Sequence, residues 1–150
     1  MPVTILGPVA GSGASLRLYS SKVSAGFPSP AQDHLEREIS LDEILQIRAP
    51  HTYLVRAGGD SMIRAGIHDG DLMVVDRSRE AEPGDIVIAA VNGEPTVKRL
   101  AKDGSQVVLR AENPRYAPRY ILEGDELLVW GVVRYSVRCH EHSWPRHRPD

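Results

Sequence analysis

From residue 53 onward, apolar residues come in short runs that are separated by turn-forming residues. The runs cover residues 53–57, 72–76, 86–91, 95–100, 106–110 and 127–135. Runs of this length, bounded by Gly, Pro, Asn and Asp, are typical of β-strands. We therefore expect a mainly β domain in which most strand pairs are antiparallel.

The clearest local signal is the sequence Val91-Asn92-Gly93-Glu94, which lies between two of these runs. Asn-Gly in this setting favours a two-residue loop of type I′, in which Val91 faces Glu94. Counting outward from the loop places Lys98 opposite Val87. Residues 102–105, Lys-Asp-Gly-Ser, predict a second turn that extends the hairpin into a meander.

The first 33 residues are rich in Gly, Ser, Ala and Pro and show no sustained apolar period. They predict a flexible arm (residues 1–33), which is followed by a domain over residues 34–136 and a disordered tail over residues 137–150. Ser40 and Glu43 have the spacing of a capping box, so we expect one short helix to begin there.

Composition and charge agree with one globular domain. Hydrophobic residues make up 41% and charged residues 25% of the 150 residues, as is ordinary for such a domain. The net charge of −2 gives no general attraction for nucleic acid, so no direct DNA binding is expected.

The single cysteine, Cys139, is consistent with a reducing cytoplasm. No apolar run reaches the ~18 residues that a membrane span needs, so we expect no membrane contact.

A serine with possible chemistry follows the first predicted strand, in Gly58-Gly59-Asp60-Ser61-Met62. Glycines allow a sharp turn that exposes the hydroxyl. Serines are also common in turns that have no catalytic role, and this remains an alternative for Ser61. The motif differs from the hydrolase nucleophile elbow, because Ile63 stands where that motif needs glycine.

Lys98 gives independent support for a catalytic Ser61. Strand alternation places Lys98 on an apolar face, together with Val87, Ala89, Thr96 and Leu100. Arg99 points to the other face. Loss of hydration on an apolar face lowers the pKa of a lysine, and a neutral lysine can take the proton of Ser61. Backbone N–H groups of Asp60 and Ser61 would then form the oxyanion hole. Alternatively, the Lys98 stem lies on the surface with its amine in water.

Several segments together form a specific signature. They are Gly59-Asp60-Ser61-Met62, Gly66-Ile67, Asp69-Gly70-Asp71-Leu72, Gly84-Asp85-Ile86-Val87 and Val97-Lys98. On these segments the chain resembles the UmuD family of S24 Ser/Lys autopeptidases and, more distantly, the C-terminal domain of LexA-type repressors. The resemblance runs from Ser24 to Tyr135. It implies a curled antiparallel sheet, Ser61 as nucleophile, Lys98 as general base and Ala25-Gly26 as the scissile pair.

The resemblance also implies a cellular role. Members of this family cut themselves when the RecA filament on single-stranded DNA promotes the cleavable conformation. The shortened product, residues 26–150, would be a homodimer and an accessory subunit of a UmuC-type Y-family DNA polymerase in SOS-response translesion synthesis. Small Ala25 suits a narrow pocket, and the prolines after Gly26 favour an extended strand suited to β-augmentation. Ala25 replaces the Cys of UmuD proteins, as in LexA-type repressors, which should leave cleavage intact.

Three other functions compete with this interpretation. A signal peptidase shares Ser/Lys chemistry, a Ser-Met motif and an arginine after the lysine, but it needs a membrane anchor. A LexA-like repressor needs three helices before the cleavage site, and the segment before Gly26 is too short and too rich in Gly and Ser. An interaction module with an inactive site is disfavoured because both Ser61 and Lys98 are present.

The C-terminal tail extends beyond the family pattern and contains residue types that bind zinc. These are Cys139, His140, His142 and His147. They lie in a Pro/Arg-rich end without an evident packed scaffold, so we expect a solvated tail without a metal. No cofactor is expected for Ser/Lys chemistry.

Overall fold

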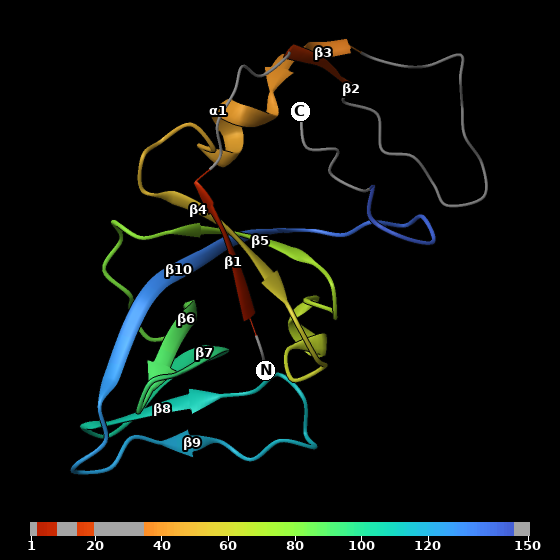
Figure 1. The fold of residues 1–150 in the computed structure, drawn as a ribbon. Coiled ribbons are helices and arrows are strands. Elements are labelled where there is room, and N and C mark those ends of the chain that lie inside the picture. Colours follow the sequence, from red (N-terminus) through yellow and green to blue (C-terminus); the bar gives the residue numbers. More distant parts are fainter. Residues whose placement is uncertain (1–2, 9–14, 20–34, 146–150) are drawn as a thin grey trace.

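The computed structural model describes residues 3–8, 15–19 and 35–145, which are mainly β-structure with one α-helix. The elements are β1 (Val3–Pro8), β2 (Ser15–Tyr19), β3 (Leu35–Ser40), α1 (Leu41–Leu45), β4 (Thr52–Ala57), the 3-10 helix η2 (Ile63–Ala65), β5 (Leu72–Asp76), β6 (Ile86–Val91), β7 (Glu94–Asp103), β8 (Gln106–Arg110), β9 (Arg119–Tyr120) and β10 (Leu127–Val137). Figure 1 shows their arrangement.

Eight of the described strands form one open antiparallel sheet in the order β1-β4-β5-β10-β6-β7-β8-β9, while β2 pairs with β3. The long strand β10 pairs with β6 through its first half and with β5 through its second half. It bends between these two parts of the sheet (Figure 1). The expected fold class, a curled antiparallel sheet with one short helix, is therefore confirmed.

The bend of β10 coincides with irregular pairing. Its register against β6 shifts between Val129 and Gly131, and irregularities of this kind bend a strand and increase its twist. A Cβ atom at Gly131 would lie 2.6 Å from Val75 Cγ1 and 3.1 Å from the Asp76 carbonyl oxygen. A Cβ atom at this position would therefore force Val75 or the strand backbone to shift.

Apolar side chains are buried on both faces of the sheet. One cluster consists of Val55, Ala57, Met62, Ile67, Met73, Val75, Ile88 and Val97, and the other of Val87, Ala89, Leu100, Leu109 and Val132. Val87 and Ile88 are neighbours on β6 but belong to different clusters, so the clusters lie on opposite faces. The turn that carries Ser61 contributes Met62 to the first cluster.

The predicted hairpin is confirmed in its register. Val91 pairs with Glu94, and Val87 pairs with Lys98. Asn92 and Gly93 have φ angles of 51° and 84°, and positive φ at both loop residues is what a type I′ turn requires. β5, β6 and β8 have the predicted bounds, whereas the sequence does not predict the two-residue strand β9.

The prediction of a capping box is wrong. The helix α1 begins after Ser40 as expected, but the Ser40 side chain makes no capping hydrogen bond. Ser40 is also the last residue of β3, where its backbone pairs with Ser15, so strand pairing fixes its orientation. At its other end, the helix is capped by Gln46, whose backbone is in the left-handed conformation with a φ of 53°.

Two strands lie within residues 1–33, for which the sequence predicts only an arm. β1 pairs with β4, so that Val3 lies opposite Ala57 and Pro8 opposite Tyr53. The predicted scissile pair Ala25-Gly26 lies outside the described residues, and its cleavage stays a prediction.

The chain after β10 contacts the domain. Arg138 donates hydrogen bonds to both carboxylate oxygens of the buried Asp71, at 3.2 and 3.0 Å, and to the Gly66 carbonyl oxygen at 2.7 Å. The Arg56 guanidinium lies 5.3 Å from the ring centroid of Trp144. These contacts lie in a segment for which the sequence predicts a disordered tail. Residues 146–150 of that tail lie outside the described residues.

Gly131→Ala tests the close contact between β10 and β5. The added methyl group must displace Val75 or the strand backbone, so we expect a loss of about 1–3 kcal/mol in the free energy of unfolding. Ser136→Ala, at an exposed position of the same strand, is the control and should change that free energy by less than about 0.5 kcal/mol. Urea denaturation measures both, and equal stability of the two variants would contradict the packing described here.

Candidate active site

Ser61 lies in the turn between β4 and η2. Gly59 in this turn has a φ of 79°, which glycine adopts without strain, and its N–H donates a 2.7 Å hydrogen bond to Asp69 Oδ1. Ser61 is 1% exposed, and the neighbouring Met62 is fully buried. The turn is therefore held in place at both ends, with the serine hydroxyl on the inner side.

Lys98 lies in the middle of β7, and its Nζ is 2.9 Å from Ser61 Oγ. The structure thus brings together the two residues that the sequence predicts as a pair. Val87, directly opposite on β6, is fully buried, so the lysine stem runs along an apolar surface. Burial lowers the pKa of Lys98 below the usual lysine value, which increases the share of neutral amine available to accept a proton.

A segment after β8 forms hydrogen bonds with the turn that carries Ser61. The Glu112 N–H donates to the Ser61 carbonyl oxygen at 2.8 Å, and the Arg64 N–H donates to the Glu112 carbonyl oxygen at 2.9 Å. Asn113 Nδ2 donates to the Asp60 carbonyl oxygen at 2.9 Å. Sequence reasoning missed this segment, although Asn113-Pro114 is a recognisable turn signal.

Arg99 fixes that segment to the sheet. Its Nε donates to Glu112 Oε1, and its Nη1 donates to the Gly84 carbonyl oxygen at 2.6 Å. Lys98 and Arg99 are successive residues of β7, so they leave opposite faces of the strand. One face of β7 therefore carries Lys98, which contacts Ser61. The other face carries Arg99, which binds the segment that holds the Ser61 turn.

Lys98 borders a cleft of about 530 Å³. Its other lining residues are Val91, Asn92, Glu94, Pro95, Thr96, Leu109, Tyr116 and Arg119. The side chain that lies over the amine is Tyr116, with its ring centroid 6.0 Å from Nζ.

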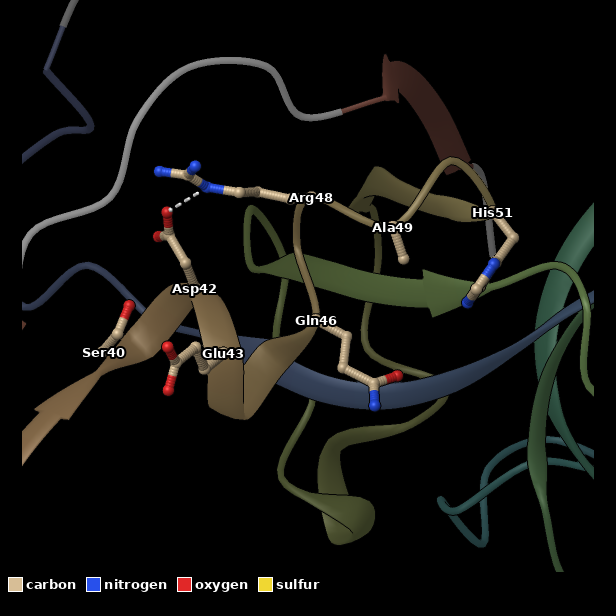
Figure 2. A pocket seen from close by; sticks show the side chains of 7 residues that line it. All are labelled: Ser40, Asp42, Glu43, Gln46, Arg48, Ala49 and His51. Carbon is tan, nitrogen blue, oxygen red and sulfur yellow. Dashed lines mark hydrogen bonds and ion pairs between the residues drawn. The ribbon is translucent and has the colours of Figure 1, made fainter.

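A second pocket, of about 640 Å³, lies beside α1. Figure 2 shows its lining side chains, which include Ser40, Glu43, Gln46 and the ion pair between Asp42 and Arg48. Neither Ser61 nor Lys98 lines it. It is therefore separate from the candidate active site, although its volume is larger.

Neither a metal centre nor a membrane span is found in the described parts of the chain. No three His, Cys, Asp or Glu side chains within residues 3–8, 15–19 and 35–145 are placed to hold a metal ion. His147 lies outside these ranges. No helix in the same ranges has the length and apolar character to cross a bilayer.

Comparison with known proteins identifies related chains. Residues 17–134 match the family model described as Peptidase S24-like. The chain is 46% identical over 116 residues to Protein SamA of Salmonella typhimurium, and this match spans 77% of this chain and 80% of SamA. It is 41% identical over 127 residues to Protein MucA of Salmonella typhimurium, and this match spans 84% of this chain and 86% of MucA. The LexA repressor of Bordetella avium is 41% identical over 119 residues, and the match spans 79% of this chain but only 55% of the repressor.

The state of the Lys98 amine can be measured directly, because the chain has only three lysines, Lys22, Lys98 and Lys102. In protein labelled with ¹³C at the lysine ε-carbon, we expect the Lys98 signal to titrate below the reference lysine pKa of about 10.4, because burial removes water from the amine. The Lys98 signal is assigned as the one that Lys98→Arg removes. Titration of that signal at the reference pKa would contradict this account.

Proposed function

Because this chain belongs to the Peptidase S24-like family, as a member of the UmuD type, we propose that Ser61 and Lys98 cut the chain itself between Ala25 and Gly26. The observation that carries this proposal is the 2.9 Å hydrogen bond between Lys98 Nζ and Ser61 Oγ, at an amine whose pKa is lowered by burial. This geometry supports a serine nucleophile with a lysine general base.

In the proposed first step, neutral Lys98 accepts the hydroxyl proton of Ser61 while Oγ attacks the carbonyl carbon of Ala25. The oxyanion that forms accepts hydrogen bonds from backbone N–H groups of Asp60 and Ser61. Within the described ranges neither N–H donates to another group. The carbonyl oxygens of both residues are held by the segment after β8, which supports a preorganised pair of donors.

In the following steps, the Lys98 ammonium gives its proton to the Gly26 nitrogen, and the bond between Ala25 and Gly26 breaks. Ala25 is then held as an ester on Ser61 Oγ. Neutral Lys98 next takes a proton from a water molecule, which attacks the ester carbon and releases the Ala25 carboxyl group. The proton returns to Ser61 Oγ, so the site is restored.

The cut would separate β1 and β2 from the rest of the chain. We propose that the RecA filament on single-stranded DNA stimulates it, and that the product, residues 26–150, forms a homodimer. The product would serve as an accessory subunit of a UmuC-type Y-family polymerase in translesion synthesis. The matches to SamA and MucA support a UmuD-type protein, because they cover most of the length of those proteins, and the proposed partners follow from the resemblance to that family.

A LexA-like repressor is the second candidate function. It is favoured by the match to the LexA repressor. The first candidate is preferred because the match covers only about half of that repressor.

Ser61→Ala and Lys98→Ala should each leave a folded protein that is not cut. Nucleophile and base act as one unit, so each change should slow cleavage at least about a thousandfold. The measurement is intact mass after incubation with RecA, ATP and single-stranded DNA, where the wild type should yield a fragment that begins at Gly26.

Ser105→Ala and Lys102→Ala are matched controls at exposed positions, and both should be cut at the wild-type rate. Cleavage of Ser61→Ala at that rate would refute the mechanism. A wild-type fragment that begins at another residue would refute the scissile bond.

A further inference from the structure

One tyrosine contacts both sides of the candidate dyad. The Tyr116 hydroxyl donates a hydrogen bond to Asp60 Oδ1, and Asp60 directly precedes the nucleophile. The ring centroid of the same side chain lies 6.0 Å from Lys98 Nζ. Tyr116 is 44% exposed, so it covers the site from the solvent side and is not part of the core.

We propose that Tyr116 is a positioning residue for self-cleavage, whose hydroxyl anchors Asp60 and whose ring keeps water from the Lys98 amine. The inference rests on the proposed function of Ser61 and Lys98. It adds a residue that neither the sequence signature nor the dyad itself identifies.

The hydroxyl completes a two-point attachment of Asp60. The carbonyl oxygen of Asp60 accepts from Asn113 Nδ2, and its carboxylate accepts from Tyr116. Both donors come from one turn, in which the Tyr116 N–H bonds the Asn113 carbonyl oxygen at 3.1 Å. A residue held at its carbonyl and at its side chain cannot rotate freely, so the N–H groups proposed for the oxyanion hole stay aimed at one point.

The hydroxyl is also suited to the pH range in which a lysine base operates. The hydrogen bond to Asp60 and the negative charge of that carboxylate raise the pKa of Tyr116 above its usual value. Tyr116 therefore keeps its proton, and remains a donor to Asp60, at the alkaline pH where more Lys98 is neutral.

The ring acts on Lys98 in two opposing ways. Its π face attracts an ammonium group, which raises the lysine pKa, and its bulk excludes water, which lowers it. A separation of 6.0 Å is at the outer limit of the attraction, so exclusion of water should dominate. We therefore expect removal of the ring to raise the pKa of Lys98.

Among residues 3–8, 15–19 and 35–145, the structure places the following other groups near the amine. Ser61 Oγ forms a hydrogen bond with the Lys98 amine, and the apolar Val87 lies opposite Lys98 on β6. The charged residues Glu94 and Arg119 line the same cleft, and Asp60 is engaged by the tyrosine. Tyr116 is the aromatic side chain that the structure places over the amine, so its removal is the change chosen to test the hydration of Lys98.

The first test does not depend on cleavage. In a Ser61→Ala background with ¹³C-labelled lysine ε-carbons, the Lys98 signal is titrated with Tyr116, with Tyr116→Phe and with Tyr116→Ala. The alanine variant should shift the Lys98 titration to higher pH, and the phenylalanine variant should not. An unchanged or lowered Lys98 pKa in Tyr116→Ala would overturn the shielding role.

The second test measures the rate of self-cleavage at one alkaline pH without RecA. Tyr116→Phe keeps the ring and loses the hydroxyl, so cleavage should slow about tenfold, the scale of a lost hydrogen bond to a charged group. Tyr120→Phe, on β9, is the matched control and should cleave at the wild-type rate. Equal rates for the two phenylalanine variants would overturn the anchoring role. If the wild type itself stays intact, the proposed function fails, while the lysine titration still decides the role of the ring.

Discussion

The hydrogen bond between Lys98 and Ser61 requires a lysine amine to lose much of its water beside a hydroxyl that is almost fully buried. Desolvation of an amine is unfavourable when the amine is charged. The surrounding structure must therefore hold both residues firmly enough to offset that cost. The features described here, from the hairpin to the segment after β8, serve that requirement.

Two rigid supports meet at the dyad. The β6–β7 hairpin fixes Lys98 opposite Val87, and apolar clusters on both faces hold the hairpin in the sheet. The turn that carries Ser61 is buried through Met62, and its backbone is hydrogen-bonded to Glu112, which Arg99 in turn binds. Because Arg99 follows Lys98 in the chain, one strand places Lys98 and also anchors the segment that supports Ser61.

Features with local causes could be predicted from the sequence. Asn92-Gly93 determines its own turn type, and strand alternation then gives the face on which Lys98 lies. The pairing of Lys98 with Val87 could therefore be predicted without a structure. The glycines before Ser61 identified the turn, and the signature around it identified the family. The bond between Lys98 and Ser61 confirms that these two signals belong together.

Features with tertiary causes could not be predicted. The contact of Tyr116 with Asp60 depends on where an irregular segment crosses the sheet, and the pairing of β1 with β4 depends on chain segments about 50 residues apart. The ion pair of Arg138 with Asp71 likewise joins segments that the pairing of β10 with β5 brings together. The pattern of apolar residues within a short stretch of sequence does not predict contacts of this kind.

The rate of spontaneous self-cleavage as a function of pH tests the central claim most directly. With Lys98 as the base, the first-order rate of loss of intact chain should rise from neutral pH toward about pH 10 and level off above the lowered lysine pKa. A histidine base would level off near a pKa of about 6.5. Ser61→Ala serves as the blank. A flat profile between about pH 7 and pH 10 in protein that stays folded would contradict Lys98 as the titrating base.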